Sequence, residues 1–335
     1  MNAIQTKPTI LIVGGAGYIG SHINCALNER GYNTIIFDNL VYGHESFVQW
    51  GKFILGDLAD KNQLRLLFSQ YKIDAVMHFA AYAYVGESVT DPYKYYINNV
   101  ANTLNLLEVM QEFDVKTLVF SSTCAVYGTP QEIPITENHP QNPINPYGRT
   151  KLMMEHIMAD AAQAYGLGYA ALRYFNAAGA DPGGRIGEWH DPETHLIPLV
   201  LEAARDQSRS ITVFGTDYET PDGTCIRDYI HVNDLSSAHC LALDHLFDQP
   251  GEYVFNLGNG QGFSVKEIID SAREITGRGI NVIYGQRRPG DPAKLVGNAQ
   301  KMLSTLNWTP QSSSIKTILQ TAWDWLQVKE QKYKT

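Results

Sequence analysis

The sequence predicts an α/β fold: a doubly wound parallel sheet followed by a smaller, mixed α/β lobe toward the C-terminus. Short apolar runs alternate with amphipathic helical patterns through the first half of the chain. These runs are continuous and rich in β-branched residues, as in strands that are buried on both faces. A glycine cluster joins the first run to the first helical pattern. Alternation at this spacing is typical of parallel strands with crossover helices.

The elements of the first half follow in order from this pattern. The predicted strands are 9–14, 33–38, 52–57, 74–80 and 116–122, and the predicted helices are 18–30, 61–70 and 96–113. A polar, proline-rich loop at 128–146 then leads to a helix opened by Tyr147 and to a strand at 169–176.

The alternation breaks down after residue 176. Residues 177–225 are rich in Gly, Pro, Asp and Thr, which predicts loops of a smaller lobe. Residues 227–243 and 252–259 look like a return to the main sheet, and 264–335 like the mixed helices and short strands of a terminal lobe.

These patterns predict two domains. We expect a nucleotide-binding domain from 1–176 plus about 226–260, and a substrate-binding domain from about 177–225 plus 261–335. Because crevices form beyond the carboxyl ends of parallel strands, a lobe that caps this edge is the expected substrate site.

Composition limits the possible functions. The 335 residues are 44% hydrophobic and 18% charged, which is ordinary for a globular protein. The formal charge of −9 argues against a nucleic-acid surface. No apolar run reaches the roughly 18 residues of a membrane span, and "MNAIQTKP" lacks a signal-peptide core. Four scattered cysteines without zinc spacing predict reduced thiols, no metal site and a cytoplasmic location.

Gly14, Gly17 and Gly20 follow the first predicted strand and open the first predicted helix. Glycine here permits a tight turn and lets backbone N–H groups approach a pyrophosphate, whose charge the helix N-terminus favours. A glycine cluster alone is often only a turn. The strand before it and the helix after it indicate a Rossmann-type dinucleotide site.

Two acidic residues end the next two strands. A carboxylate at Asp38 is placed to accept hydrogen bonds from the adenosine ribose and to repel a 2′-phosphate, although a turn residue is the alternative. No Arg occurs within the dozen residues after Asp38, which also favours NAD over NADP. For Asp57, an adenine contact and a helix-capping role fit equally well.

Tyr147 and Lys151 are four residues apart, so a helix places both side chains on one face. A tyrosine with its ordinary pKa of about 10 is a poor base at neutral pH. An ammonium about 4 Å away contributes roughly 4 kcal/mol, which can lower a phenol pKa by up to about three units. The spacing also arises by chance on helices, but beside a dinucleotide site it predicts acid–base catalysis.

Thr123 lies at the end of the fifth predicted strand. Its hydroxyl suits either a hydrogen bond to a substrate oxygen or a capping role. Ser121 and Ser122 share this ambiguity.

The glycine spacing, the strand-end hydroxyl and the Tyr-x-x-x-Lys pattern together resemble the extended short-chain dehydrogenase/reductase superfamily. More closely, the chain is similar to the UDP-glucose 4-epimerase family over nearly its whole length. Segments that occur in the family's order are "GGAGYIGSH", "FDNL", "HFAA", "VGESV", "NNV", "SSTCAVYG", "PYGRTK", "LRYFNAAGA", "GTCIRDYIHVNDL", "NLGNG" and "RRPGDPA".

The resemblance implies an isomerase of galactose metabolism that interconverts UDP-galactose and UDP-glucose with tightly bound NAD. In this family a Tyr phenolate removes the proton of the sugar 4-hydroxyl while hydride passes from C4 to NAD. The 4-keto sugar turns over and the hydride returns to its other face. Family members commonly dimerise through a four-helix bundle, and helices 96–113 and 147–165 are the candidates here.

The resemblance also assigns residues. Tyr147 becomes the base, Lys151 lowers its pKa and holds the nicotinamide ribose, and Thr123 contacts the substrate oxygen. The implied cofactor contacts are Gly14, Gly17, Tyr18, Ile19, Gly20, Asp38, Asn39, Asp57, Leu58, Phe79, Ala80, Ala81, Asn98, Thr123, Tyr147, Lys151 and Phe175. The implied substrate contacts are Thr123, Tyr147, Asn176, His195, Phe214, Arg227, Tyr229, Arg288 and Asp291.

The chemistry of the arginines agrees with this assignment. Guanidinium groups bind a diphosphate in bidentate fashion, and Arg227 and the pair Arg287–Arg288 stand out in an acidic chain. A surface salt bridge is the alternative for each.

Some positions depart from the family pattern. Thr123 replaces a Ser but keeps the hydroxyl, Ala83 stands where a Lys can contact the cofactor, and His195 stands where Asn is frequent. Leu295 lies where a Tyr often walls the sugar pocket and where members that accept N-acetylated sugars have a small residue. This intermediate size predicts a preference for UDP-glucose and UDP-galactose.

Four other functions are weighed against this one. A nucleotide-sugar 4,6-dehydratase needs Asp-Glu after the strand-end Thr, but the chain has Cys124 and Ala125 there. A UDP-glucuronate decarboxylase and an epimerase of UDP-pentoses or UDP-GlcNAc stay open. A non-catalytic dinucleotide sensor has no need of Tyr147 with Lys151.

Overall fold

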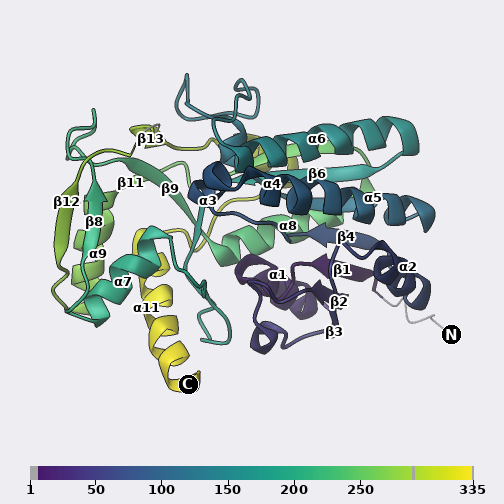
Figure 1. The fold of residues 1–335 in the computed structure, drawn as a ribbon, viewed down its shortest axis with the longest axis horizontal. Coiled ribbons are helices and arrows are strands. Elements are labelled where there is room, and N and C mark those ends of the chain that lie inside the picture. Colours follow the sequence, from purple (N-terminus) through teal and green to yellow (C-terminus); the bar gives the residue numbers. More distant parts are fainter. Residues whose placement is uncertain (1–6, 289–290, 334–335) are drawn as a thin grey trace. The chain divides into compact units, whose positions relative to one another are not determined.

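The computed structural model describes residues 7–288 and 291–333 and divides into two compact units. The first unit comprises Met1–Val126, Asn145–Arg173 and Ser236–Phe255, and the second comprises Tyr127–Ile144, Tyr174–Leu235 and Asn256–Thr335. The N-terminal stretch without a signal-peptide core and residues 289–290 of the Arg-Arg-Pro-Gly-Asp motif fall outside the described residues. Figure 1 labels the elements along the chain.

A seven-stranded sheet forms the centre of the first unit, in the order β10-β6-β5-β4-β1-β2-β3. Strand β1 pairs in parallel with both β2 and β4, and β2–β3 and β4–β5 are also parallel. The predicted doubly wound sheet is confirmed. Its strands are β1 (Thr9–Val13), β2 (Asn33–Asp38), β3 (Lys52–Leu55), β4 (Ala75–His78), β5 (Thr117–Thr123), β6 (Gly168–Tyr174) and β10 (Glu252–Leu257).

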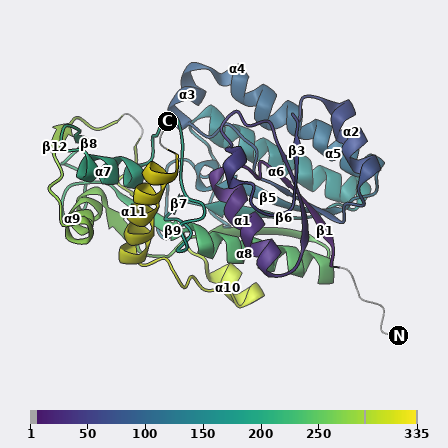
Figure 2. The same ribbon diagram turned by 90° about the horizontal axis from the view of Figure 1, so that it is seen from below.

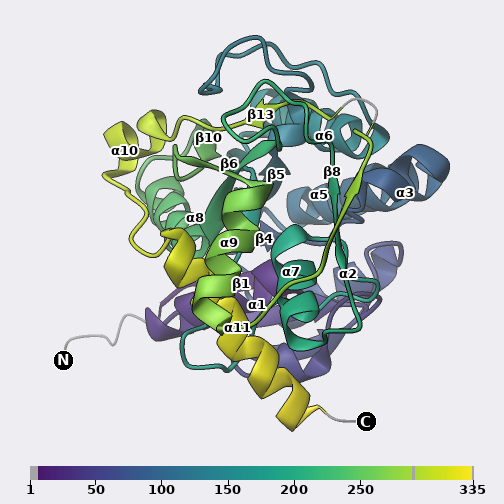
Figure 3. The same cartoon turned by 90° about the vertical axis from the view of Figure 1, so that its left-hand side faces the viewer.

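Helices cover both faces of this sheet (Figures 2 and 3). Helices α2, α5 and α6 lie on one face, and α1 and α8 lie on the other. Helices α1 and α8 are linked by an ion pair of 3.2 Å between Arg30, which follows α1, and Asp244 of α8. The helices are α1 (Tyr18–Glu29), α2 (Lys61–Gln70), α3 (Val85–Thr90), α4 (Pro92–Tyr95), α5 (Asn102–Glu112), α6 (Pro146–Tyr165) and α8 (Val232–Asp248).

The sequence defines both ends of α6. The Asn145 side chain accepts a hydrogen bond from the Gly148 N–H at 2.8 Å, and Pro146 occupies the first turn, where its missing N–H costs nothing. Gly166 ends the helix in a left-handed conformation with φ of 74°. The helix therefore begins one residue before the predicted Tyr147.

The predicted continuous α-helix at 96–113 is wrong in its first turns. Residues Tyr96–Ala101 form a π-helix, and α5 begins only at Asn102. The buried Asn99 of this π-helix donates to the Tyr82 carbonyl at 3.0 Å and accepts from the Tyr82 N–H at 2.9 Å. Such distant partners are not visible in helical periodicity.

Short sheets and four helices make up the described part of the second unit. Strand β9 (Ile226–His231) pairs with β7 (Asn176–Ala178), β11 (Gly262–Ser264) and β13 (Lys294–Leu295). Strands β8 (Ile211–Phe214) and β12 (Val282–Gly285) form a separate parallel pair. The helices are α7 (Leu196–Arg205), α9 (Val265–Thr276), α10 (Gln300–Leu306) and α11 (Ile315–Lys332), which agree with the mixed lobe predicted for 264–335.

Two predictions for this unit are wrong. The strand near 227 does not return to the main sheet. It forms β9, which pairs with β7 and β13 in a separate sheet. Helix α7 interrupts the predicted loops of 177–225. The signal for it was present, since the buried Ile197, Val200, Leu201 and Ala204 have helical spacing.

The segment 127–144 belongs to the second unit, whereas the sequence placed it in the first domain. Its contacts explain this difference. The Ile135 N–H donates to the Val296 carbonyl at 2.8 Å, and the Asn256 N–H donates to Glu137 at 2.7 Å.

Two further findings concern the described chain as a whole. No helix within it combines the length and apolarity that a membrane crossing needs. The cysteines are not joined by a disulfide.

Candidate active site

The glycine loop of the first unit has no room for a side chain at Gly14 or at Gly20. Gly14 has a φ of 81°, and a Cβ atom on it would lie 2.4 Å from the Ala80 nitrogen. A Cβ on Gly20 would lie 2.3 Å from the Gly14 carbonyl oxygen. Helix α1 begins after Gly17 with no side-chain cap and no acidic residue in its first turn. A bare helix N-terminus beside a close-packed turn fits a pyrophosphate.

Alanine substitutions separate the two roles of these glycines. Gly20→Ala is expected to destabilise the chain by about 1–3 kcal/mol, because its Cβ meets backbone atoms. Gly17→Ala is expected to fold normally, since its Cβ would lie 3.4 Å from the nearest atom. It should nevertheless bind NAD roughly 10-fold or more weakly, because the methyl group obstructs the helix N-terminus. Thermal unfolding and NAD titration of both variants measure these effects, and equal losses in both assays would contradict the assignment.

Asp38 ends β2 and lies beside the glycine loop. Its carboxylate accepts from the Ala16 N–H at 3.0 Å and from the Leu40 N–H at 2.9 Å. Burial raises its pKa, and these backbone hydrogen bonds oppose the shift. The N–H of Ala16 thus joins the glycine loop to the carboxylate that was predicted to bind the ribose.

Asp57 is not the helix cap that the sequence left open. Asp60 caps α2, accepting from the N–H groups of Asn62 and Gln63 at 3.1 and 3.0 Å. Asp57 instead accepts from the Asn39 side chain at 2.8 Å. The structure therefore brings together two residues predicted to contact NAD.

Further predicted cofactor contacts of this unit follow β4 or lie in the π-helix. The N–H groups of Phe79 and Ala80 both donate to the Val13 carbonyl, at 2.7 and 3.1 Å. Asn98 donates to Asn99 at 3.0 Å, and Asn99 donates to Thr150 of α6 at 3.2 Å. Sequence reasoning missed Asn99, whose side chain links this loop to α6.

Thr123 and Lys151 are both buried where β5 meets α6. The Thr123 hydroxyl accepts from the Ala125 N–H at 3.2 Å, so it also caps the following turn. The Lys151 ammonium donates to the Ser121 carbonyl at 2.8 Å and lies 4.8 Å from the centre of the Phe120 ring. Burial lowers the pKa of Lys151 to about 7, although Glu155 partly offsets this effect.

A buried ion pair lies one helical turn beyond Lys151. Glu155 of α6 and Arg173 of β6 are 4% and 2% exposed, and Glu155 also accepts from the Ser122 hydroxyl at 2.5 Å. Sequence reasoning missed this pair. The signal was a charged residue four positions after Lys151, on the same buried helix face. The pair fixes α6 against β5 and β6, which holds Lys151 in place.

Tyr147 lies in the first turn of α6 and is half-buried. Its carbonyl accepts from the Thr150 hydroxyl at 2.7 Å. The first unit thus contains the glycine loop, Asp38, Asn39, Asp57, Thr123, Tyr147 and Lys151. Of the predicted cofactor contacts, Phe175 belongs to the second unit.

In the second unit, β9 presents Arg227 beside β13. The Arg227 guanidinium forms an ion pair with Asp291 and is 12% exposed. Leu295 is the register partner of Arg227 across the two strands. Between Arg227 and Tyr229, the buried Asp228 accepts from the N–H groups of Asn259, Gly260 and Gly297 at 2.8, 3.2 and 3.1 Å. These bonds join three loop residues around the base of β9.

The two arginines of the Arg-Arg motif differ. Arg288 stacks its guanidinium 4.1 Å from the centre of the Phe214 ring, so two predicted substrate contacts touch each other. Arg287 pairs instead with Asp217 at 2.6 Å and is 43% exposed, which is the surface salt bridge left open by the sequence. Asn176 donates to the Asp228 carbonyl at 2.8 Å and thereby reaches β9 as well.

His195 lies at the start of α7 and belongs to an ionic cluster. Its Nδ1 atom is 2.6 Å from Glu188 and 3.5 Å from Glu193. Burial alone lowers the pKa of His195, but the two carboxylates outweigh it and raise this pKa to about 10. The same balance raises the pKa of His190 to about 9. Sequence reasoning singled out only His195 and did not foresee its partners.

The chain is similar to known epimerases in both sequence and structure. The model of the NAD dependent epimerase/dehydratase family matches residues 10–258. The chain is 52% identical to a UDP-glucose 4-epimerase of Halalkalibacterium halodurans, over 94% of this chain and 95% of the relative. The UDP-glucose 4-epimerase of Brucella ovis in complex with NAD has a TM-score of 0.92 and 50% identity, over 95% of this chain and 98% of that one. The enzyme of Bifidobacterium longum in complex with NAD⁺ and UDP has a TM-score of 0.91 and 39% identity, over 95% and 98% of the two chains.

Proposed function

The chain belongs to the NAD dependent epimerase/dehydratase family, and from this premise we propose how its residues interconvert UDP-glucose and UDP-galactose. The chain is an NAD-dependent isomerase that acts at C4 of the sugar of UDP-glucose. The proposed residue roles are supported by the buried Lys151 ammonium, which donates to the Ser121 carbonyl of β5 and lies one turn after Tyr147 on α6.

The first unit is proposed to hold NAD. The uncapped N-terminus of α1 and the turn at Gly14 fit the pyrophosphate. Asp38 accepts from the adenosine ribose, and the Asn39–Asp57 pair lies beside the adenine. NAD held by these residues would supply a hydride acceptor and donor for C4 of the sugar.

Tyr147 is proposed to take the proton of the sugar 4-hydroxyl and to return it after the 4-keto sugar has turned over. Lys151 lies in the next turn of α6 and favours the phenolate through its ammonium. The Thr123 hydroxyl is proposed to hydrogen-bond the same sugar oxygen. Because burial lowers the pKa of Lys151 to about 7, its charge is available only in part at neutral pH before ligands bind.

The second unit is proposed to hold the UDP moiety. Arg227 and Arg288 provide guanidinium groups for the diphosphate. Asn176, Phe214, Tyr229, Asp291 and His195 complete the proposed contacts. A sugar attached to a firmly held UDP can rotate about its link to the diphosphate without leaving the enzyme.

Loss of the Arg227 guanidinium should weaken substrate binding more than chemistry. Arg227→Met is expected to raise KM for UDP-galactose about 10–100-fold with a much smaller change in kcat, because a charge-assisted hydrogen bond to the diphosphate is lost in ground and transition states alike. Arg287→Met is the matched control and should change KM little, since Arg287 is an exposed partner of Asp217. Similar KM values for both variants would refute the role of Arg227. Steady-state kinetics of the two variants decide this point.

The proposed mechanism is tested by incubating the purified chain with UDP-galactose and no added NAD. Formation of UDP-glucose is the expected result, because the family resemblance implies a cofactor that stays bound through the cycle. Failure without NAD but activity with it would show that the cofactor exchanges. No UDP-glucose under either condition would refute the proposal.

Product analysis across several UDP-sugars separates the alternative substrates. Leu295, the strand neighbour of Arg227, predicts faster turnover of UDP-glucose than of UDP-GlcNAc. Equal rates would contradict this preference. Decarboxylation of UDP-glucuronate, or a clear preference for UDP-pentoses, would favour the other members of the superfamily.

We further propose that the chain works in the cytoplasm as a homodimer. Exposed apolar side chains on α3, α4, the π-helix, α5 and α6 of the first unit support an interface with a second copy of the chain at these helices. They are Val89, Tyr93, Ile97, Leu104 and Met153. Sedimentation analysis should show a dimer for the parent and a monomer for Ile97→Lys, because the introduced ammonium would be buried in the interface. A monomeric parent would contradict this proposal.

A further inference from the structure

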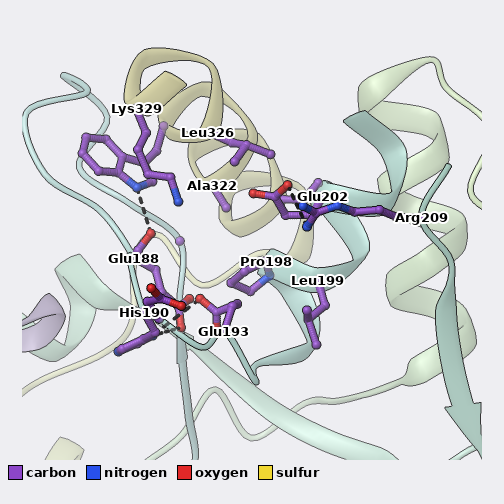
Figure 4. A pocket seen from close by; sticks show the side chains of 14 residues that line it. Glu188, His190, Glu193, Pro198, Leu199, Glu202, Arg209, Ala322, Leu326 and Lys329 are labelled. Atoms are coloured by element: carbon purple, nitrogen blue, oxygen red, sulfur yellow. Dashed lines mark hydrogen bonds and ion pairs between the residues drawn. The ribbon is translucent and has the colours of Figure 1, made fainter. Parts of the chain in front are cut away.

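Four ligand-type side chains converge in the loop that leads into α7. They are Glu188, His190, Glu193 and His195, and one ligand atom from each lies within 4.8 Å of all the others. Figure 4 shows Glu188, His190 and Glu193 turned toward one another at the edge of a pocket. The spacing E-x-H-x-x-E-x-H brings all four from a stretch of only eight residues.

The separations suit a tetrahedral ion. An ion bound at 2.0–2.2 Å holds its ligand atoms roughly 3.3–3.6 Å apart. The Nδ1 atom of His190 lies 3.4 Å from Glu188 and 3.5 Å from one oxygen of Glu193, and that of His195 lies 3.5 Å from the other Glu193 oxygen. The His195–Glu188 pair, at 2.6 Å, would have to open, and any pair near the 4.8 Å limit of the cluster would have to close. The two imidazole rings meet edge to face, with centres 5.2 Å apart.

The surrounding residues hold these groups in position. The Trp325 indole of α11 donates to the Glu188 carbonyl at 2.9 Å. One oxygen of Glu193 accepts from the N–H groups of Thr194 and His195 at 2.8 and 2.9 Å, which leaves the other oxygen toward His190. Outer contacts of this kind orient metal ligands in proteins.

The charges of the cluster are balanced within the cluster itself. The side chain of Glu188 is only 6% exposed and that of Glu193 is 17% exposed. Within the described residues, the ion pairs of both carboxylates are with His190 and His195 alone. Arg205 and Arg209 are engaged by Glu202 of α7. The Lys329 ammonium lies over the Trp189 ring at 5.4 Å.

We propose that Glu188, His190, Glu193 and His195 bind one divalent transition metal ion of the Zn²⁺ class. Metal binding would release the proton of each imidazolium to solvent, and the resulting two neutral imidazoles and two carboxylates balance the charge of such an ion. Imidazole nitrogen favours Zn²⁺ over Mg²⁺ and Ca²⁺, which prefer oxygen ligands. The His195 side chain is 52% exposed, so the ion can enter from solvent. The bound ion would fix the 188–195 loop to the first turn of α7 and, through Trp325, to α11.

The alternative is a cluster of two imidazolium–carboxylate pairs that never binds metal. Titration of the chelator-treated full-length chain with Zn²⁺ and with Co²⁺ distinguishes the two. We expect one saturable site, a Co²⁺ absorption spectrum of tetrahedral nitrogen and oxygen ligands, and a higher thermal midpoint with Zn²⁺. Absence of saturable binding would overturn the proposal.

Variants assign the site. His190→Asn and Glu193→Gln are each expected to weaken metal binding about 100-fold or more, since even the loss of an outer partner costs 10–100-fold. The matched controls are His156→Asn on α6 and Glu274→Gln on α9, both exposed, which should bind like the parent. Unchanged affinity in the cluster variants, or a thiolate–cobalt band that indicates cysteine ligands, would refute the site. Glu193→Gln serves if His190→Asn does not fold, as judged by circular dichroism.

Discussion

Replacing Tyr147 with phenylalanine is expected to lower kcat for UDP-galactose by about 10²–10⁴-fold, which is the usual contribution of a positioned acid–base group. Only the hydroxyl oxygen is removed, and the aromatic ring in the first turn of α6 stays. KM should change little, because the proposed contacts to UDP lie in the second unit. Conversion of UDP-galactose to UDP-glucose, followed by chromatography of the products, measures the effect.

Tyr165→Phe is the matched control for this prediction. Tyr165 ends the same helix and is 53% exposed, so loss of its hydroxyl should leave kcat unchanged. NAD titration of Tyr147→Phe shows whether the cofactor site remains intact. If Tyr147→Phe turned over at the parent rate, the chain would have a different base, and the Tyr147–Lys151 spacing would be a feature of the helix alone.

The sequence predicted those parts of the site that depend on local geometry. Gly14 and Gly20 lie in one tight turn, and Asp38 follows at the end of the next strand, so strand–turn–helix patterning is enough to place them. Tyr147 and Lys151 share one helix face for the same reason. In each case the residues that must meet are separated by one element at most.

Features that depend on distant partners could not be predicted in this way. Glu155 is visible in the sequence as a charge on a buried helix face, but its partner Arg173 lies on β6 and its other partner, Ser122, lies on β5. Strand β9 looked like a strand of the main sheet, because periodicity does not identify pairing partners. Asn99 gave no signal, since its role depends on a π-helix and on the Tyr82 loop.

Replacing Lys151 with methionine is expected to abolish most activity and yet to stabilise the ligand-free chain. The kcat should fall about 10²–10³-fold, because a nearby ammonium contributes up to roughly 4 kcal/mol to the phenolate. Burial lowers the pKa of Lys151 from 10.5 to about 7, and this difference of 3.5 units corresponds to a cost on the order of 5 kcal/mol in the folded state. Methionine removes that cost. It also leaves the Ser121 carbonyl without its donor, which destabilises the variant by about 1–3 kcal/mol. The expected net gain at neutral pH is about 2–4 kcal/mol.

The pH dependence of the stability gain distinguishes the loss of a buried charge from simple repacking, which would not depend on pH. Between pH 7 and 10.5 the unfolded chain binds the Lys151 proton and the folded chain does not, so the unfolding free energy of the parent rises with pH across this window. Lys151→Met has no such proton. Its advantage over the parent should therefore be largest at pH 7 and below and should shrink as the pH approaches 10.5. Urea midpoints at about pH 6.5 and about pH 9.5 measure the difference.

Lys72→Met provides the control, because the Lys72 side chain is 91% exposed and should show neither the gain nor its pH dependence. A Lys151→Met variant that is less stable than the parent at pH 6.5 would mean that the ammonium is well solvated or paired in the folded chain. The reason for its burial would then be structural. A more stable but inactive variant would instead show that the fold tolerates a costly buried charge at Lys151 because the reaction needs an ammonium beside the phenol of Tyr147.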